Sequence, residues 1–130
     1  MKTKKLVVHT DIIADHLLQS EQEPSLLRMA MRRYFCYTTV VNAMELFSCT
    51  GSDRQRRAVE HTLGAMKILG VNSRTAKNFG TLIRQYPDQP LGDLLVAGIC
   101  LESRLPLLTR LQERFSGIRN LRLVRPASIG

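Results

Sequence analysis

The sequence has no tryptophan, few acidic residues and no long uninterrupted apolar segment. A helix needs about 20 consecutive apolar residues to span a bilayer, so we expect no membrane span and no membrane partner. The basic start "MKTKKLVV" is similar to the beginning of a secretion signal, but His9, Asp11 and Asp15 interrupt the apolar stretch that follows. No small-residue cleavage motif comes after it. The composition therefore predicts a cytoplasmic protein.

Cysteine is scarce and odd in number, and Cys36, Cys49 and Cys100 lie far apart in the sequence. No two of them have the CxxC spacing that is typical of zinc and redox sites. We expect three reduced thiols that pack as small apolar side chains. A zinc site or a catalytic thiol is the alternative interpretation.

Negative charge is in short supply, with 11 acidic residues against 19 lysines and arginines and a net charge of +8. From Leu101 onward the chain has six arginines and only Glu102 and Glu113 as acids. An arginine guanidinium can bind two phosphate oxygens at once, and a basic surface attracts polyanions. This distribution predicts a nucleic acid as a partner. A solvated basic face and an acidic protein partner are the alternatives.

Short apolar segments alternate with amphipathic ones along the whole chain, which at 130 residues is expected to form one domain, residues 1–130. Alternating strands and helices predict an α/β fold with a mainly parallel central sheet and helices on both faces. The predicted strands are 6–8, 37–41, 68–72, 106–109 and 121–125, the last at an edge. The predicted helices are 12–19, 24–35, 42–47, one that begins after Ser52 or Asp53, 74–86, 91–101 and 112–118.

Three acidic residues occupy positions that are costly for a charge. Asp11 follows the first predicted strand, Glu45 lies within the apolar segment "NAMELF", and Asp93 begins the most apolar helix. A carboxylate among apolar side chains needs a partner. Asp11 and Asp93 are suited to cap helices, and Glu45 has capping-box spacing to Asn42. Alternatively, the three acids converge on one Mg²⁺ or Mn²⁺ ion, which prefers oxygen ligands.

Three segments in this order resemble a PIN domain, especially the small VapC-type toxins of bacterial toxin–antitoxin pairs. "LVVHTDIIADHL" is similar to the opening strand and helix of the family, and "NAMELF" to the segment that carries its glutamate. "LGDLLVAGICLESRLPLLTR" and "RFSGIRNLRLVRP" are similar to its Asp-led apolar helix and its last strands. The resemblance spans nearly the whole chain and implies a three-layer PIN-like domain.

The resemblance also implies an activity and partners. PIN toxins are ribonucleases in which acidic residues hold Mg²⁺ or Mn²⁺ and activate water for attack on RNA. They form homodimers and bind an antitoxin protein. Position by position, Glu45 and Asp93 match two of the family's acids, Thr10 matches the threonine after the first acid, and Thr109 matches the hydroxyl residue before the last one.

The sequence departs from the family pattern at three places. His9 stands at the position of the first aspartate, and Leu111 and Arg114 stand where further acidic residues are common. We expect Asp11 to replace the missing aspartate, so that Asp11, Glu45 and Asp93 are the predicted metal ligands. The predicted catalytic residues are Asp11, Glu45, Asp93, His9 and Thr109. The residues expected to contact RNA are Arg110 and Arg114.

Two functions are compatible with these departures. The first is a divalent-metal-dependent endoribonuclease with a remodelled site. The second is a catalytically inactive PIN-fold module that binds RNA or protein. For His9, the sequence leaves open a hydrogen-bonded structural role, a role as metal ligand and acid–base work. A DNA-binding regulator has no helix-turn-helix pattern to support it.

Overall fold

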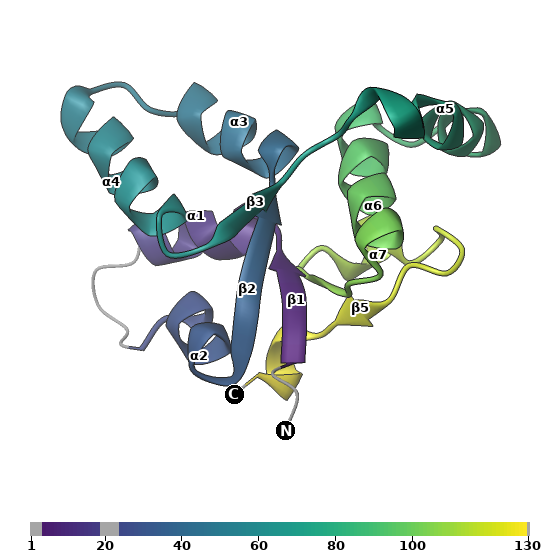
Figure 1. The fold of residues 1–130 in the computed structure, drawn as a ribbon. Helices are drawn as coiled ribbons and strands as arrows, with labels where there is room; N and C mark the ends of the chain where they lie inside the picture. Colours follow the sequence, from purple (N-terminus) through teal and green to yellow (C-terminus); the bar gives the residue numbers. More distant parts are fainter. Residues whose placement is uncertain (1–3, 19–23, 130) are drawn as a thin grey trace.

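The computed structural model describes residues 4–18 and 24–129, and the structural statements below concern this part of the chain. Its centre is a parallel sheet of five strands in the order β3-β2-β1-β4-β5 (Figure 1). The strands are β1 (Lys4–Val8), β2 (Tyr34–Thr39), β3 (Lys67–Leu69), β4 (Leu107–Leu108) and β5 (Leu123–Val124). The helices are α1 (Thr10–Leu18), α2 (Leu26–Arg33), α3 (Val40–Ser48), α4 (Asp53–Leu63), α5 (Ala76–Gln85), α6 (Leu91–Ser103) and α7 (Gln112–Phe115), with short 3-10 helices at Ser73–Thr75 and Pro126–Ser128.

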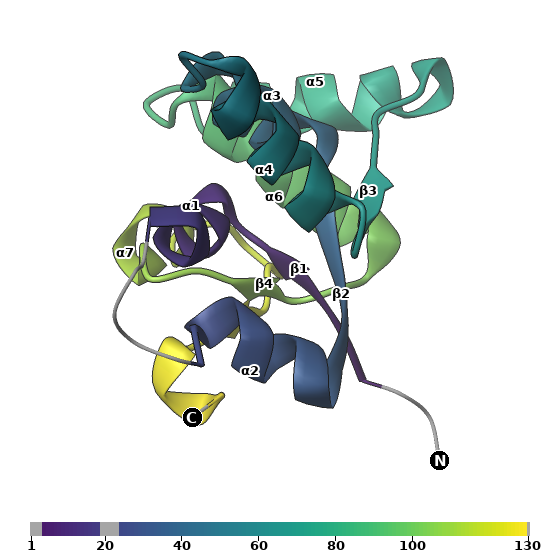
Figure 2. The same cartoon turned by 90° about the vertical axis from the view of Figure 1, so that its left-hand side faces the viewer.

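Alternate residues of β1 point to opposite faces of the sheet and divide the core in two. Leu6 and Val8 pack in one apolar cluster with residues of α1, α2, α3 and α4, whereas Val7 packs in a second with residues of α5, α6 and α7. The first group of helices faces the viewer in Figure 2, and α6 covers the opposite face (Figure 1). The prediction of a parallel α/β sheet covered on both faces is confirmed, and β5 lies at an edge as expected.

The boundary between α2 and β2 differs from the prediction. The helix was expected over residues 24–35, but α2 ends at Arg33, and Tyr34 already pairs in register with Lys4. The aromatic pair Tyr34 and Phe35 thus extends β2 toward the start of β1. Aromatic residues fit a pleated sheet well, and pairing with β1 overrides the helical pattern of the preceding residues.

Three expected helix caps are also corrected. Thr39, not Asn42, is the N-cap of α3, because its hydroxyl oxygen accepts a hydrogen bond from the Asn42 backbone N–H at 3.1 Å. Asp11 and Asp93 each lie inside the first turn of a helix, one residue or more beyond the cap position. Their carboxylates are therefore free for contacts outside the helix ends. The predicted end of the first helix, Gln19, lies outside the described residues.

All three cysteines are free, with Cys36 and Cys100 buried and Cys49 exposed. Burial raises the pKa of the Cys36 thiol to about 11 and that of the Cys100 thiol to about 12. The described residues hold no group of three His, Cys, Asp or Glu side chains placed for a metal ion. Within those same residues, no helix is both long and apolar enough to cross a membrane.

Candidate functional site at the carboxyl end of the sheet

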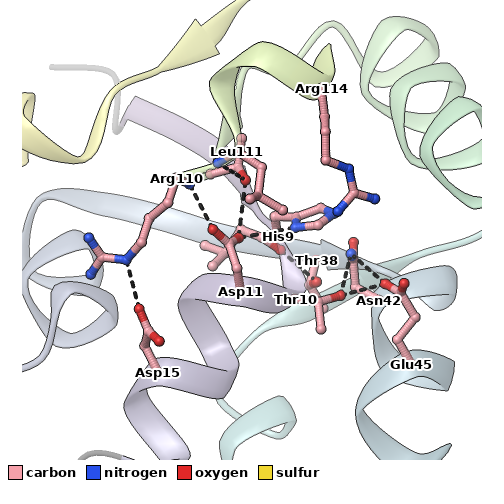
Figure 3. A network of polar contacts seen from close by, with 12 residues as sticks. His9, Thr10, Asp11, Asp15, Thr38, Asn42, Glu45, Arg110, Leu111 and Arg114 are labelled. Carbon is pink, nitrogen blue, oxygen red and sulfur yellow. Dashed lines mark hydrogen bonds and ion pairs between the residues drawn. The ribbon is translucent and has the colours of Figure 1, made fainter. Parts of the chain in front are cut away.

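The predicted site residues come together where β1, β2 and β4 end (Figure 3). His9 and Thr10 follow β1, Asn42 and Glu45 lie on the helix that follows β2, and Thr109 follows β4. Carboxyl ends of parallel strands lie along one edge of a sheet, which is the usual location of sites in open α/β folds. The sheet thus joins segments that are about a hundred residues apart.

Asp11 is held by three donors from two segments. His9 Nδ1 lies 3.0 Å from Asp11 Oδ1, the Thr109 hydroxyl donates to the same oxygen at 3.1 Å, and the Arg110 backbone N–H donates to Oδ2 at 2.7 Å (Figure 3). Burial opposes the charge of Asp11, but these hydrogen bonds and the charge of His9 together lower its pKa below 3.8. Both carboxylate oxygens therefore already have protein partners.

His9 is almost fully buried, with 4% of its surface exposed. An ionised carboxylate can only accept a hydrogen bond, so Nδ1 of His9 is protonated and donates to Asp11. The His9 ring also meets Phe115 edge to face at 5.2 Å, and its backbone N–H donates to the Leu108 carbonyl. These contacts give His9 a hydrogen-bonded structural role, while metal binding and acid–base work stay predictions.

A second network leads from the interior to Glu45. Buried Asn42 donates from Nδ2 to the Thr10 hydroxyl at 2.8 Å, and Thr10 donates to Glu45 Oε1 at 2.6 Å (Figure 3). The Thr39 hydroxyl donates to Asn42 Oδ1 at 2.7 Å and so orients the Asn42 amide. Sequence reasoning treated Asn42 only as a cap. Its position three residues before Glu45, directly after a strand, was the available signal.

Asp93 makes an ion pair with Arg114. Arg114 Nε donates to Asp93 Oδ2 at 3.0 Å, and Nη2 donates to Oδ1. Asp93 is buried, with 5% of its side chain exposed, whereas Arg114 keeps 47% exposed. The hydrogen bond that Arg114 donates to Asp93 raises the pKa of Arg114 against the opposing effect of burial, and the charges of Asp93, Glu45 and Asp11 raise it further.

The other arginine that was expected to contact RNA also has an intramolecular acid. Arg110 Nε lies 2.7 Å from Asp15 Oδ2, and both side chains are about half exposed. Binding of RNA by Arg110 and Arg114 stays a prediction, but each arginine must share its charge with a carboxylate of the same chain. Neither acid partner was paired with its arginine by sequence reasoning, since the residues are 95 and 21 positions apart.

The three predicted metal ligands surround a cation, but that cation is Arg114. Asp93 binds it directly, and the charges of Asp11 and Glu45 act on it. The imidazole of His9 suits Mg²⁺ poorly as a ligand. In the part of the chain that the structure describes, no three acidic, His or Cys side chains are placed to hold a metal. The donor set of this conformation does not fit a divalent metal ion.

Comparisons with known proteins find similarity in structure only. No family model and no curated protein matches the sequence. The VapBC complex of Salmonella typhimurium, solved with DNA, contains a chain that matches with a TM-score of 0.78 and 17% identity, over 95% of this chain and 98% of that one. VapBC2 of Rickettsia felis, bound to a promoter DNA fragment, matches with a TM-score of 0.78 and 15% identity over 93% and 98%.

A toxin–antitoxin complex from Klebsiella pneumoniae matches with a TM-score of 0.74 and 20% identity, over 93% of this chain and 97% of that one. Agreement over nearly the full length of both chains, at such low identities, concerns the fold. The chain therefore has the PIN-domain fold of the VapC and FitB toxins.

Proposed function

We propose that this chain is a non-hydrolytic PIN-fold protein, which acts by binding a macromolecular partner rather than by metal-dependent cleavage of RNA. The observation that carries the proposal is the ion pair in which Arg114 occupies both carboxylate oxygens of Asp93. A divalent ion at this position would have to displace a guanidinium that three acids stabilise. Metal-dependent hydrolysis requires such an ion to activate water and to neutralise the phosphate.

The arrangement around Asp11 supports the same proposal. Its two oxygens accept from a histidine, a hydroxyl and a backbone N–H, so the charged carboxylate is already stabilised by partners within the protein. His9 stands where the PIN family has an aspartate and adds no negative charge. Compared with the PIN family pattern, His9 and Arg114 each stand where an acidic residue is common. As a result, the acidic residues of this site pair with side chains of the same chain.

The partner class that the comparisons support is an antitoxin-type protein. Each of the three similar structures contains a toxin-type chain in a toxin–antitoxin complex. RNA is a second partner, because the net charge of +8 attracts polyanions.

The proposal is tested by comparing the wild-type chain with the double variant His9→Asp/Arg114→Asp. We would titrate Mn²⁺ by calorimetry and follow a labelled RNA in Mg²⁺ and in Mn²⁺. The wild-type chain is expected to bind neither ion at the acidic end and to leave the RNA intact. The double variant restores two carboxylates and is expected to gain Mn²⁺ binding.

Asp93→Asn and the exposed Asp88→Asn provide a matched pair, since each removes one carboxylate and only the first touches the site. Metal-dependent cleavage by the wild-type chain that Asp93→Asn abolishes and Asp88→Asn leaves unchanged would overturn the proposal. That result would establish the remodelled endoribonuclease instead, with Arg114 moving aside when metal binds.

A further inference from the structure

Away from the acidic end, the opposite end of the sheet carries a cluster of cations. The side chains of Lys4, Lys5, Arg104 and Arg122 line one open hollow together with Tyr34, which we call the basic hollow. It lies at the amino ends of β1 and β2, the lower end of these strands in Figure 1. Its lining contains no Asp or Glu. Four like charges therefore meet without a carboxylate in the same hollow.

These cations differ from Arg110 and Arg114 in having no acidic partner. Within residues 4–18 and 24–129, Lys4, Lys5, Arg104 and Arg122 make no ion pair, and all four are exposed. Arg122 is oriented by a hydrogen bond from its Nη2 to the Arg104 carbonyl at 2.7 Å. The Arg122 guanidinium is thus partly preorganised to bind an anion.

Aromatic rings lie next to the two lysines. The parallel register of β1 and β2 pairs Lys4 with Tyr34 and Lys5 with Phe35. Phe35 is 46% exposed, and its ring lies 4.9 Å from that of Tyr37. Cations beside exposed aromatic rings are the combination with which proteins bind single-stranded nucleic acids, phosphates on the cations and bases on the rings.

We propose that the basic hollow binds a single-stranded polynucleotide, with its phosphates on Lys4, Lys5, Arg104 and Arg122. A base stacks on Phe35, which pairs with Lys5 in the sheet and lies outside the lining of the hollow. The concave shape favours a flexible polyanion over a flat lipid surface. The exposed ring favours a nucleic acid over free phosphate, which has nothing to stack. The site lies at the far end of the sheet from His9 and Asp93, so it does not depend on the state of the acidic end.

The test measures fluorescence anisotropy of a short labelled single-stranded RNA with a chelator present, so that any metal-dependent cleavage cannot consume the probe. Lys5→Glu/Arg122→Glu changes the hollow, and Lys77→Glu/Arg84→Glu makes the same charge change on exposed positions of α5. Both variants lower the net charge from +8 to +4. The first is expected to weaken binding roughly tenfold or more and the second only about twofold.

Salt dependence separates charge from stacking. The logarithm of affinity should fall with the logarithm of salt, and loss of two phosphate contacts in the hollow variant should reduce this slope by about 1.4. Phe35→Ala should weaken binding about fivefold or more and leave the slope unchanged. Ile83→Ala, another exposed apolar residue, is its control and should bind like the wild-type chain.

Circular dichroism and thermal unfolding show whether each variant keeps the native fold before it is compared. Single-stranded DNA of the same sequence shows whether the hollow reads the 2′-hydroxyl or the polynucleotide in general. Equal binding by the hollow and α5 variants would overturn the proposal. So would equal competition by inorganic phosphate, or vesicles of anionic phospholipid that bind with the same dependence on Lys5 and Arg122.

Discussion

The imidazole of His9 donates from Nδ1 to Oδ1 of Asp11 across 3.0 Å, two residues apart at the start of α1. Thr109 and the Arg110 backbone bind the same carboxylate from the segment after β4. Asp11 thus ties two crossovers of the sheet together. A residue expected to hold a metal instead joins parts of the polypeptide.

Asp11 predicts a stability that depends on pH. Its pKa is lowered in the folded chain, so its contribution is present above the unfolded value of about 3.9 and is lost as pH falls through the lower folded value. Asp11→Asn should cost roughly 1–3 kcal/mol in free energy of unfolding at pH 7, since charge-assisted hydrogen bonds are lost. Urea unfolding of the wild-type chain and of Asp11→Asn, at pH 7 and at acidic pH, measures this difference in free energy of unfolding. A cost that does not shrink in acid would contradict this account.

The Arg114–Asp93 pair predicts a coupling that an exposed pair lacks. Arg114→Gln leaves the buried carboxylate of Asp93 with fewer partners and should lower the free energy of unfolding by roughly 1–3 kcal/mol. The same substitution should cost less in a chain that already carries Asp93→Asn. The half-exposed pair Arg110–Asp15 is the control and should show a coupling of at most about 1 kcal/mol. Two double-mutant cycles by urea unfolding compare them. Equal couplings would show that burial of Asp93 adds nothing.

Two helical glycines predict opposite effects of the same substitution. A Cβ at Gly98 on α6 would lie 2.5 Å from Cε2 of the buried Phe79 ring, whereas a Cβ at Gly80 on α5 meets nothing within 4 Å. Gly98→Ala should destabilise the chain by roughly 1–3 kcal/mol through overpacking. Gly80→Ala should stabilise it by about 0.5–1 kcal/mol because alanine favours the helix. Thermal unfolding of both variants gives the sign directly, and a stabilised Gly98→Ala would show that Phe79 yields easily.

The cysteines predict selective labelling. Burial raises the pKa of the Cys36 and Cys100 thiols to about 11 and 12, and only a thiolate reacts with iodoacetamide. At neutral pH the native chain should therefore take up one label, at exposed Cys49, and three labels after unfolding. Mass spectrometry counts them, and Cys49→Ser should abolish labelling of the native chain. Rapid labelling of Cys36 in the native state would contradict its burial.

Much of the fold could be predicted from local patterns. Continuous apolar segments marked the buried strands, and Ser52 and Pro87 stand at helix boundaries as expected. The boundary between α2 and β2 could not be predicted in this way, because Tyr34 and Phe35 are compatible with a helix or a strand. Only their pairing with β1 decides that they belong to β2. The short strands β4 and β5, in contrast, were expected, and the structure adds their partners: β4 pairs with β1, and β5 pairs with β4.

The site was predictable as a collection of residues but not as a set of contacts. Position after a strand placed His9 and Asp11 at one edge of the sheet, and the resemblance placed Glu45, Asp93 and Thr109 there too. Which side chain binds which depends on distances of a few ångströms between distant segments. Asp93 could have faced a metal, a helix terminus or Arg114 with the same local sequence.

By itself, the sequence determined the α/β class, the basic charge and the acidic residues of the PIN-like segments, because apolar periodicity and residue type are local properties. Tertiary structure alone decided that Arg114 binds Asp93, that Asp11 binds His9 and Thr109, and that Lys4, Lys5, Arg104 and Arg122 share a hollow at the far end. These pairings depend on how the crossovers pack on the sheet. The physical reason is that charges act through space, while the order of residues specifies only their separation along the chain.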